Sequence, residues 1–385
     1  MKMKKLLRET VVFLITSVVA FALTVGLVYA IAHLGGGIDK SGAKPGTTSV
    51  ILLSVFSMLF AVFIQTLLHE AGHLVCGLST GYRFLSFRIL NWAVVKALDG
   101  RFSLRTYSVP GTIGQCLLVP PTVGDKLKTP YFWYNAGGVF FNFLSILVLL
   151  VVLASVKVSV ALFLVGVMNV VVGFFFMVLN GIPMSNGGLY NDGKNTLCLF
   201  RNKALRENFY NQLAVNALMT YGKRLCEMPD RLFAPVKLDD YSNTILLSSM
   251  LANASREEDC GNMETAYGMM REVWAHESRL PNFFRNDIKA ECMMLACLTG
   301  RHAATAGWED PKLERYLAAT VKFSAGKVPP LYALELLVRN DSQKAQAIRE
   351  KMEAHENKYV YPGEVRMAKA LMERIDMYKA GDAIN

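Results

Sequence analysis

The chain has 385 residues, of which 52% are hydrophobic and 19% are charged, and its formal net charge is +10. Soluble globular chains carry about 25% charged residues, so this composition excludes a disordered or collagen-like chain and is unusual for a fully soluble protein. The seven cysteines form no Cys-X-X-Cys pair and are odd in number, which favours reduced thiols over a disulfide framework or a zinc knuckle.

Four long segments contain no Asp, Glu, Lys or Arg over most of their length. A transmembrane helix needs about 20 predominantly apolar residues, so we expect spans near residues 10–33, 47–78, 131–155 and 158–180. The first apolar stretch is longer than the apolar core of a signal peptide, and we therefore expect a retained anchor there.

The charges are distributed unevenly, and their distribution predicts an orientation. Residues 1–193 carry 14 basic and 6 acidic side chains, whereas residues 194–385 carry 27 and 25. The positive excess lies in residues 1–9 and 80–128, and the positive-inside rule places both segments, together with the C-terminal half, in the cytoplasm. We expect a multi-pass integral protein of the plasma membrane, in contact with the lipid bilayer and without a nucleic-acid partner.

The rest of the chain divides into a strand-rich segment and a helical one. Residues 81–118 are rich in aromatic and β-branched residues and predict a β-hairpin or small sheet at the cytoplasmic membrane surface. Further helical patterns, separated by Pro and Gly, lie at 203–227, 240–256, 262–278, 284–299, 311–325, 330–338, 342–357 and 363–379.

The fold class follows from these patterns. We expect a mainly α protein with two domains. Residues 1–193 form a membrane-embedded helical core of about four spans with a small β-hairpin region. Residues 194–385 form a cytoplasmic, all-helical soluble domain, either a repeat-like array or a plain bundle, which can bind a protein partner.

The sequence His-Glu-Ala-Gly-His stands at residues 69–73, near the end of the second span. Residues i and i+4 share a helix face, so His69 and His73 can bind one metal ion while Glu70 lies beside it to accept a proton from water. Zn²⁺ suits two imidazoles and an open position. Ionisable residues are costly inside a membrane segment, which makes them functional candidates.

A catalytic zinc ion usually has three protein ligands. None of the other four histidines is well placed, and Asp192 is the only acidic residue between Asp125 and Glu207. The second and fourth spans both end on the cytoplasmic side in the topology deduced from charge. We therefore expect Asp192 to lie at the depth of the two histidines and to be the third ligand. The alternative is an Asx turn, in which Asp192 caps its own backbone.

A His-Glu-X-X-His sequence in a membrane helix, followed by an Asp-Gly next to a later one, resembles the site-2 protease family of intramembrane zinc metalloproteases. The resemblance covers about residues 47–195. It implies that His69, His73 and Asp192 bind zinc and that Glu70 activates water. It also implies that the strand-rich segment can pair with an unwound substrate.

Two further stretches bear on the resemblance. Ala136-Gly137-Gly138 followed by Asn142 is similar to the family's Ala-Gly-Pro…Asn stretch, with Gly in place of Pro. Asn180 occupies the place of the Asn in the family's Asn-Pro…Asp-Gly motif, but it is followed by Gly and lies farther from the Asp. Asn142 and Asn180 are therefore candidates to hydrogen-bond the substrate or its oxyanion, with helix capping or packing as the alternative.

Together, these features predict an intramembrane zinc metalloendopeptidase that hydrolyses a peptide bond in or near a transmembrane segment of a membrane protein substrate. The alternative is a catalytically inactive, membrane-anchored scaffold, which predicts a saturated four-ligand site or no metal. A transporter ranks last, because the first, third and fourth expected spans have no ionisable residue near their middle.

Overall fold

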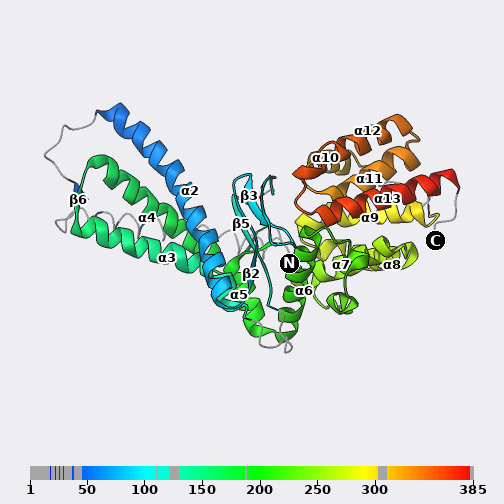
Figure 1. The fold of residues 1–385 in the computed structure, drawn as a ribbon, viewed down its shortest axis with the longest axis horizontal. Coiled ribbons are helices and arrows are strands. Elements are labelled where there is room, and N and C mark those ends of the chain that lie inside the picture. The colour runs from blue at the N-terminus through cyan, green and yellow to red at the C-terminus, as the bar shows by residue number, and fades with distance from the viewer. Residues whose placement is uncertain are drawn as a thin grey trace.

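The computed structural model describes residues 46–109, 111–121, 130–186, 189–301 and 310–381, with a few isolated positions before residue 46. The first expected span, residues 10–33, therefore lies outside the described residues except at isolated positions, and it stays a prediction. The described chain is mostly helical and contains one small antiparallel sheet (Figure 1).

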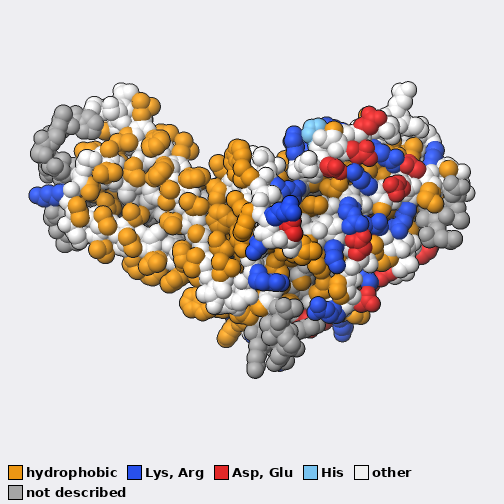
Figure 2. Space-filling model, viewed as in Figure 1, with side chains coloured by type: hydrophobic (Ala, Val, Ile, Leu, Met, Phe, Trp, Pro, Cys, Tyr) orange, Lys and Arg blue, Asp and Glu red, His pale blue; other side chains and the backbone are white. Residues whose placement is uncertain are grey.

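Three described helices are long and apolar enough to cross a membrane: α2 (Thr47–Ser79), α3 (Phe132–Ser155) and α4 (Val160–Gly181). They coincide with the second, third and fourth expected spans. The three helices pack on one another and expose large apolar side chains such as Leu52, Val151 and Leu162. Figure 2 shows this apolar surface over the helices, whereas charged side chains gather over the C-terminal half. A surface of this kind is suited to contact with lipid.

Helices α2 and α3 approach each other closely at Gly72 and Gly137. A Cβ atom on Gly72 would lie 2.2 Å from the carbonyl oxygen of Gly137, and a Cβ atom on Gly137 would lie 2.4 Å from the carbonyl oxygen of Gly72. Small residues allow membrane helices to bring their backbones together in this way. The glycines in both sequence motifs therefore set the distance between the two helices.

The Gly137→Ala variant should be destabilised, because its new methyl group meets the backbone of α2. Overpacking of this kind costs about 1–3 kcal/mol, and it should lower the thermal unfolding midpoint measured in detergent. Gly268→Ala is the matched control, since a Cβ atom there meets nothing within 4 Å and replacing a helical Gly by Ala gains up to about 1 kcal/mol. Equal midpoints for the two variants would contradict the close helix contact.

The sheet contains β2 (Arg83–Ile89), β3 (Trp92–Lys96), β4 (Phe102–Thr106) and β5 (Gly114–Val119), in the order β4-β3-β2-β5. All its neighbouring strands are antiparallel. The expected strand-rich segment therefore forms a four-stranded sheet. Strand β5 packs against α2, which places one edge of the sheet beside the His-Glu-Ala-Gly-His sequence. Short strand pairs join β1 (Gly37–Ile38) to β6 (Lys157–Val158) and β7 (Ser185–Asn186) to β8 (Leu189–Tyr190).

Helices make up most of the described residues after 191, close to where the sequence patterns predict them. They are α5 (Asp192–Arg201), α6 (Lys203–Thr220), α7 (Thr244–Cys260), α8 (Met263–Trp274), α9 (Asn282–Leu298), α10 (Pro311–Thr320), α11 (Val328–Ala333), α12 (Ser342–Glu353) and α13 (Pro362–Ala380). Short helical turns lie at η2 (Leu225–Glu227), η3 (Asp230–Phe233), η4 (Glu277–Arg279), η6 (Ala325–Lys327) and η8 (Glu356–Lys358), and η7 (Leu334–Val338) is a π-helix. A large apolar core joins α7, α8, α9, α11 and α13.

Apolar packing and hydrogen bonds connect the helical half to the sheet. Leu213 of α6 packs with Tyr82 and Leu118, and the Arg105 guanidinium of β4 donates hydrogen bonds to three backbone carbonyls between residues 357 and 360. The expected domain boundary at 193/194 falls in the first turn of α5, and α5 packs on α3 and α4. Helix α5 therefore connects the membrane helices to the C-terminal half.

Candidate metal centre

The structure brings His69, His73 and Asp192 together. The two imidazoles lie on one face of α2, near its C-terminal end, and Asp192 begins α5. The two Nε2 atoms are 3.1 Å apart. Asp192 Oδ2 lies 3.1 Å from the Nε2 of His69 and 3.4 Å from that of His73. Among the described residues, this is the one group of three such side chains close enough to share a metal ion.

The size of this triangle matches a zinc site. Zinc bonds to nitrogen and oxygen of about 2.0–2.1 Å, in tetrahedral geometry, place the ligand atoms about 3.3 Å apart. The three observed separations of 3.1, 3.1 and 3.4 Å lie close to that value. The three ligand atoms therefore need little movement to bind one ion.

Hydrogen bonds on the far side of each ring determine which nitrogen faces the centre. His73 Nδ1 lies 2.7 Å from the carbonyl oxygen of Tyr134, which can only accept, so Nδ1 carries the proton. His69 Nδ1 lies 2.7 Å from Asn142 Oδ1. The amide of Asn142 is oriented by the backbone carbonyl of Gln65, to which its Nδ2 donates at 3.0 Å. Both imidazoles therefore keep their Nε2 lone pairs directed at the centre, as metal-binding histidines do.

Three hydrogen-bond acceptors, the two Nε2 atoms and Asp192 Oδ2, thus point at one place. The described residues supply no hydrogen-bond donor there. His69 is 6% exposed. When both Nε2 atoms are unprotonated, the buried Asp192 Oδ2 has no hydrogen-bond donor among the described residues. An unsatisfied buried acceptor costs about 1–3 kcal/mol. A single proton can bridge only one pair of these atoms and leaves the third acceptor unpaired. A metal cation satisfies all three at once, so the residues fit such an ion.

Glu70 is adjacent to the metal centre and is 9% exposed. Its carboxylate makes no hydrogen bond or ion pair with the residues that the structure describes, although it interacts electrostatically with both histidines and Asp192. Gly114, at the start of β5, makes room for it, because a Cβ atom there would lie 2.7 Å from Glu70 Oε1. The carboxylate is therefore available to bind water.

Two glycines next to the centre have the same steric role. A Cβ atom on Gly138 would lie 2.5 Å from His69 Cε1 and 2.6 Å from His73 Nε2. A Cβ atom on Gly193 would lie 2.1 Å from the carbonyl oxygen of Gly181, at the end of α4. Gly138 thus lets α3 cover the imidazoles, and Gly193 lets α5 begin against α4.

Asn191, which is not among the predicted site residues, fixes the start of α5. Its Nδ2 donates to two carbonyls at the end of α4. Its Oδ1 accepts from the backbone N–H of Met184 and from that of Lys194, the second of which caps α5. Asp192 is therefore the first residue of a helix and does not cap a turn of its own. An Asn directly before a helical segment is the signal that identifies such a cap.

The two candidate oxyanion residues occupy different positions. Asn142 donates both amide hydrogens to Gln65. The backbone and side-chain oxygens of Gln65 lie 3.0 and 2.9 Å from Asn142 Nδ2. Asn142 thus positions His69 and has no amide hydrogen left for a substrate. The amide of Asn180 donates to the carbonyl of Phe176 within its own helix. Neither contact supports binding of an oxyanion.

The Asn142→Ala variant should bind zinc 10–100 times more weakly, because outer residues that orient a ligating histidine contribute about that much. Competition with a chromophoric chelator measures the affinity. Asn180→Ala is the control, since its side chain bonds only within α4 among the described residues. An equal loss in both variants would show that Asn142 acts through general stability and not through His69.

No protein-family model matches the chain, and neither a curated protein nor a solved structure matches it. The resemblance to site-2 proteases therefore rests on the sequence motifs, and the geometry of the metal centre is independent of that resemblance.

Proposed function

We propose that the chain is an intramembrane zinc metalloendopeptidase. The observation that carries this proposal is the convergence of three acceptors, from His69, His73 and Asp192, beside the Glu70 carboxylate, which has no hydrogen-bond partner among the described residues. A structural zinc site is closed by four protein ligands, whereas three ligands leave a position open for chemistry.

Each residue then has a defined task. A zinc ion held by the triangle would polarise a peptide carbonyl and lower the pKa of water to about 7. Glu70 takes a proton from the water and passes it to the leaving amine. Asn142 and the carbonyl of Tyr134 hold the imidazoles in the required tautomer.

The position of the centre along α2 supports access for water. A helix of 33 residues is about 50 Å long, which exceeds the hydrocarbon thickness of about 30 Å. His73 lies about 9 Å from the end of this helix at Ser79. The centre is therefore close to one membrane face, the same end of the bundle at which the sheet and α5 lie (Figure 1).

The substrate class follows from this location. A peptide bond in a transmembrane helix is protected by internal hydrogen bonds and becomes reactive only when the helix unwinds. Strand β5 is an edge strand whose first residue, Gly114, contacts Glu70. An unwound segment of a membrane protein that adds to this edge would pass the proposed base.

The proposed orientation places the N-terminus, the sheet and residues 194–385 in the cytoplasm, with the chain in the plasma membrane. The positive charge of residues 80–128 supports this orientation. The helical half then lies on the same side as the proposed active site, where it can bind a protein partner.

The test uses the full chain in detergent with a membrane-peptide reporter. We expect about one zinc ion per chain, loss of cleavage after chelation, and recovery when zinc alone is restored. Cleavage that survives complete removal of metal would refute the proposal. Bound zinc without cleavage of any membrane peptide would favour the catalytically inactive scaffold.

A further inference from the structure

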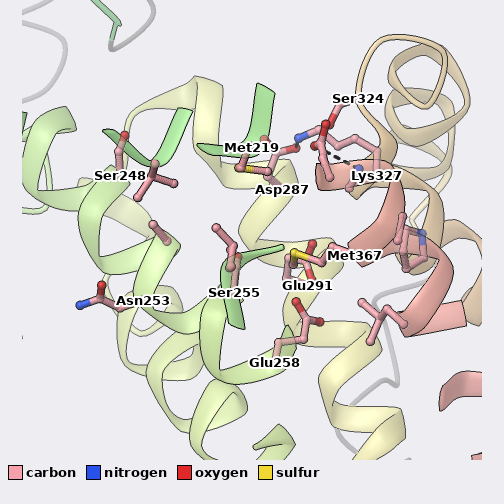
Figure 3. Close-up of a pocket in the computed structure, with 18 of the residues that line it drawn as sticks. Met219, Ser248, Asn253, Ser255, Glu258, Asp287, Glu291, Ser324, Lys327 and Met367 are labelled. Atoms are coloured by element: carbon pink, nitrogen blue, oxygen red, sulfur yellow. Dashed lines mark hydrogen bonds and ion pairs between the residues drawn. The ribbon is translucent and has the colours of Figure 1, made fainter. Parts of the chain in front are cut away.

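A separate cavity lies among the C-terminal helices, and none of the metal-centre residues lines it. Its volume is about 420 Å³, and it is formed by α6, α7, α9, α13 and the segment from η6 to α11 (Figure 3). Small-molecule sites in proteins usually measure about 300–1,000 Å³. The cavity is therefore large enough for a small organic ligand.

Small side chains on α7 create this space. Ser248, Ala252 and Ser255 recur at helical spacing along the lining. Larger apolar side chains from other helices, including Val215 and Leu371, also line the cavity. The lining thus contains both polar and apolar groups.

Most charged groups in the lining are already paired. Asp287 forms an ion pair with Lys327 and accepts a hydrogen bond from the hydroxyl of Tyr316. Glu364 accepts hydrogen bonds from the Ser324 hydroxyl at 2.7 Å and from the Gly326 backbone N–H at 3.1 Å. Lys327, the one basic side chain in the lining, is therefore paired with Asp287.

Glu258 and Glu291 form no ion pair among the described residues, and their side chains hydrogen-bond each other. They extend toward the cavity from α7 and α9 (Figure 3). Glu258 is 2% exposed. One oxygen of each carboxyl, Glu258 Oε1 and Glu291 Oε2, is buried and has no hydrogen-bond partner in the described part of the chain. Nη1 of the nearby Arg374 donates hydrogen bonds to the backbone carbonyls of Glu258 and Asp259. Two carboxyl groups therefore face the cavity, and neither forms an ion pair with a described basic side chain.

The pKa values of both groups reflect this environment. Burial, followed by the neighbouring Glu291 carboxylate, raises the pKa of Glu258 well above its ordinary value. Burial likewise raises the pKa of Glu291 to about 8. Burial therefore favours the neutral form of each carboxyl group, whereas a bound cation would favour the ionised form.

We propose that this cavity binds a small organic cation, with its amine or guanidinium group against the carboxyl groups of Glu258 and Glu291 and its hydrocarbon part against the apolar side chains of the lining. The volume exceeds the needs of one metal ion, because a water molecule occupies about 30 Å³. Two carboxylates also fall short of the six to eight oxygen ligands that Ca²⁺ takes. Four acidic side chains against one lysine in the lining disfavour an anion.

Calorimetry on the full chain in detergent tests this site without any measurement of proteolysis. The probes are agmatine, which carries an amine and a guanidinium, the neutral 1-pentanol and the anionic glutarate. We expect saturable binding of agmatine alone. The Glu291→Gln and Glu258→Gln variants should each weaken that binding at least tenfold, while Glu257→Gln should leave it unchanged, because the Glu257 carboxylate bonds Asn262 outside the cavity.

A thermal melt without probe verifies that each Gln variant is folded. If one variant does not fold, the other gives the same comparison against Glu257→Gln. The proposal is overturned if wild-type protein does not bind agmatine, if pentanol binds equally well, or if a folded Glu291→Gln or Glu258→Gln variant keeps wild-type affinity.

Discussion

The Glu70→Gln variant should keep its zinc and lose at least 100-fold in the rate of peptide cleavage. General acid–base catalysis contributes about 10²–10⁴-fold, and a Gln amide has nearly the shape of the Glu carboxylate but cannot accept the proton. The carboxylate has no described hydrogen-bond partner to lose, so its replacement should leave the metal centre intact. Cleavage of the membrane-peptide reporter and metal content by mass spectrometry provide the two measurements.

Glu70→Ala and Glu257→Gln complete this comparison. The Ala variant should be as inactive as the Gln variant, whereas Glu257→Gln, on a distant helix, should cleave at the wild-type rate. Unchanged cleavage in both Glu70 variants would exclude this residue as the base. Loss of zinc from Glu70→Gln would instead identify Glu70 as a ligand.

The Asp192→Ala variant should lose tight zinc binding. Asp192 supplies one corner of the triangle, and no other described acidic side chain lies close enough to replace it. The expected loss of affinity exceeds the 10–100-fold typical of residues that only orient a ligand. Zinc stoichiometry after dialysis, together with chelator competition, measures the effect.

Asp192→Asn provides a graded comparison, because the amide oxygen keeps its place but carries no charge. We expect its zinc affinity to fall between those of Asp192→Ala and the wild type. Circular dichroism checks that α5 stays folded, since Asn191 still caps it. Full retention of tight binding in Asp192→Ala would show that the third ligand lies elsewhere.

The features that sequence predicts well here depend on local or compositional signals. Three membrane-length helices follow from uninterrupted apolar runs, and the shared face of His69 and His73 follows from helical spacing. The sequence predicts Asp192 as the third ligand for two reasons. It is an isolated acidic residue after a span, and the charge distribution places the ends of the second and fourth spans on one side of the membrane. The structure places Asp192 beside both histidines, as this pattern predicts.

The features that sequence does not predict arise from contacts between distant elements. Gln65 and Asn142 are 77 residues apart and meet only because α2 and α3 cross at two glycines. The sequence does not predict helix α5, because the Asn-Asp-Gly stretch at its start is as compatible with a turn as with a helix. Glu258 and Glu291 resemble ordinary acids on amphipathic helices, and only the packing of α7 and α9 turns both toward one cavity.

A crystal structure of the purified chain, with anomalous data collected at the zinc absorption edge, tests the metal centre most directly. It should show one zinc peak about 2.0–2.2 Å from the Nε2 atoms of His69 and His73 and from a carboxylate oxygen of Asp192. The fourth position should face Glu70 and contain no protein ligand. A fourth protein ligand, or a fully folded chain with no zinc bound at these residues, would contradict the proposed active site.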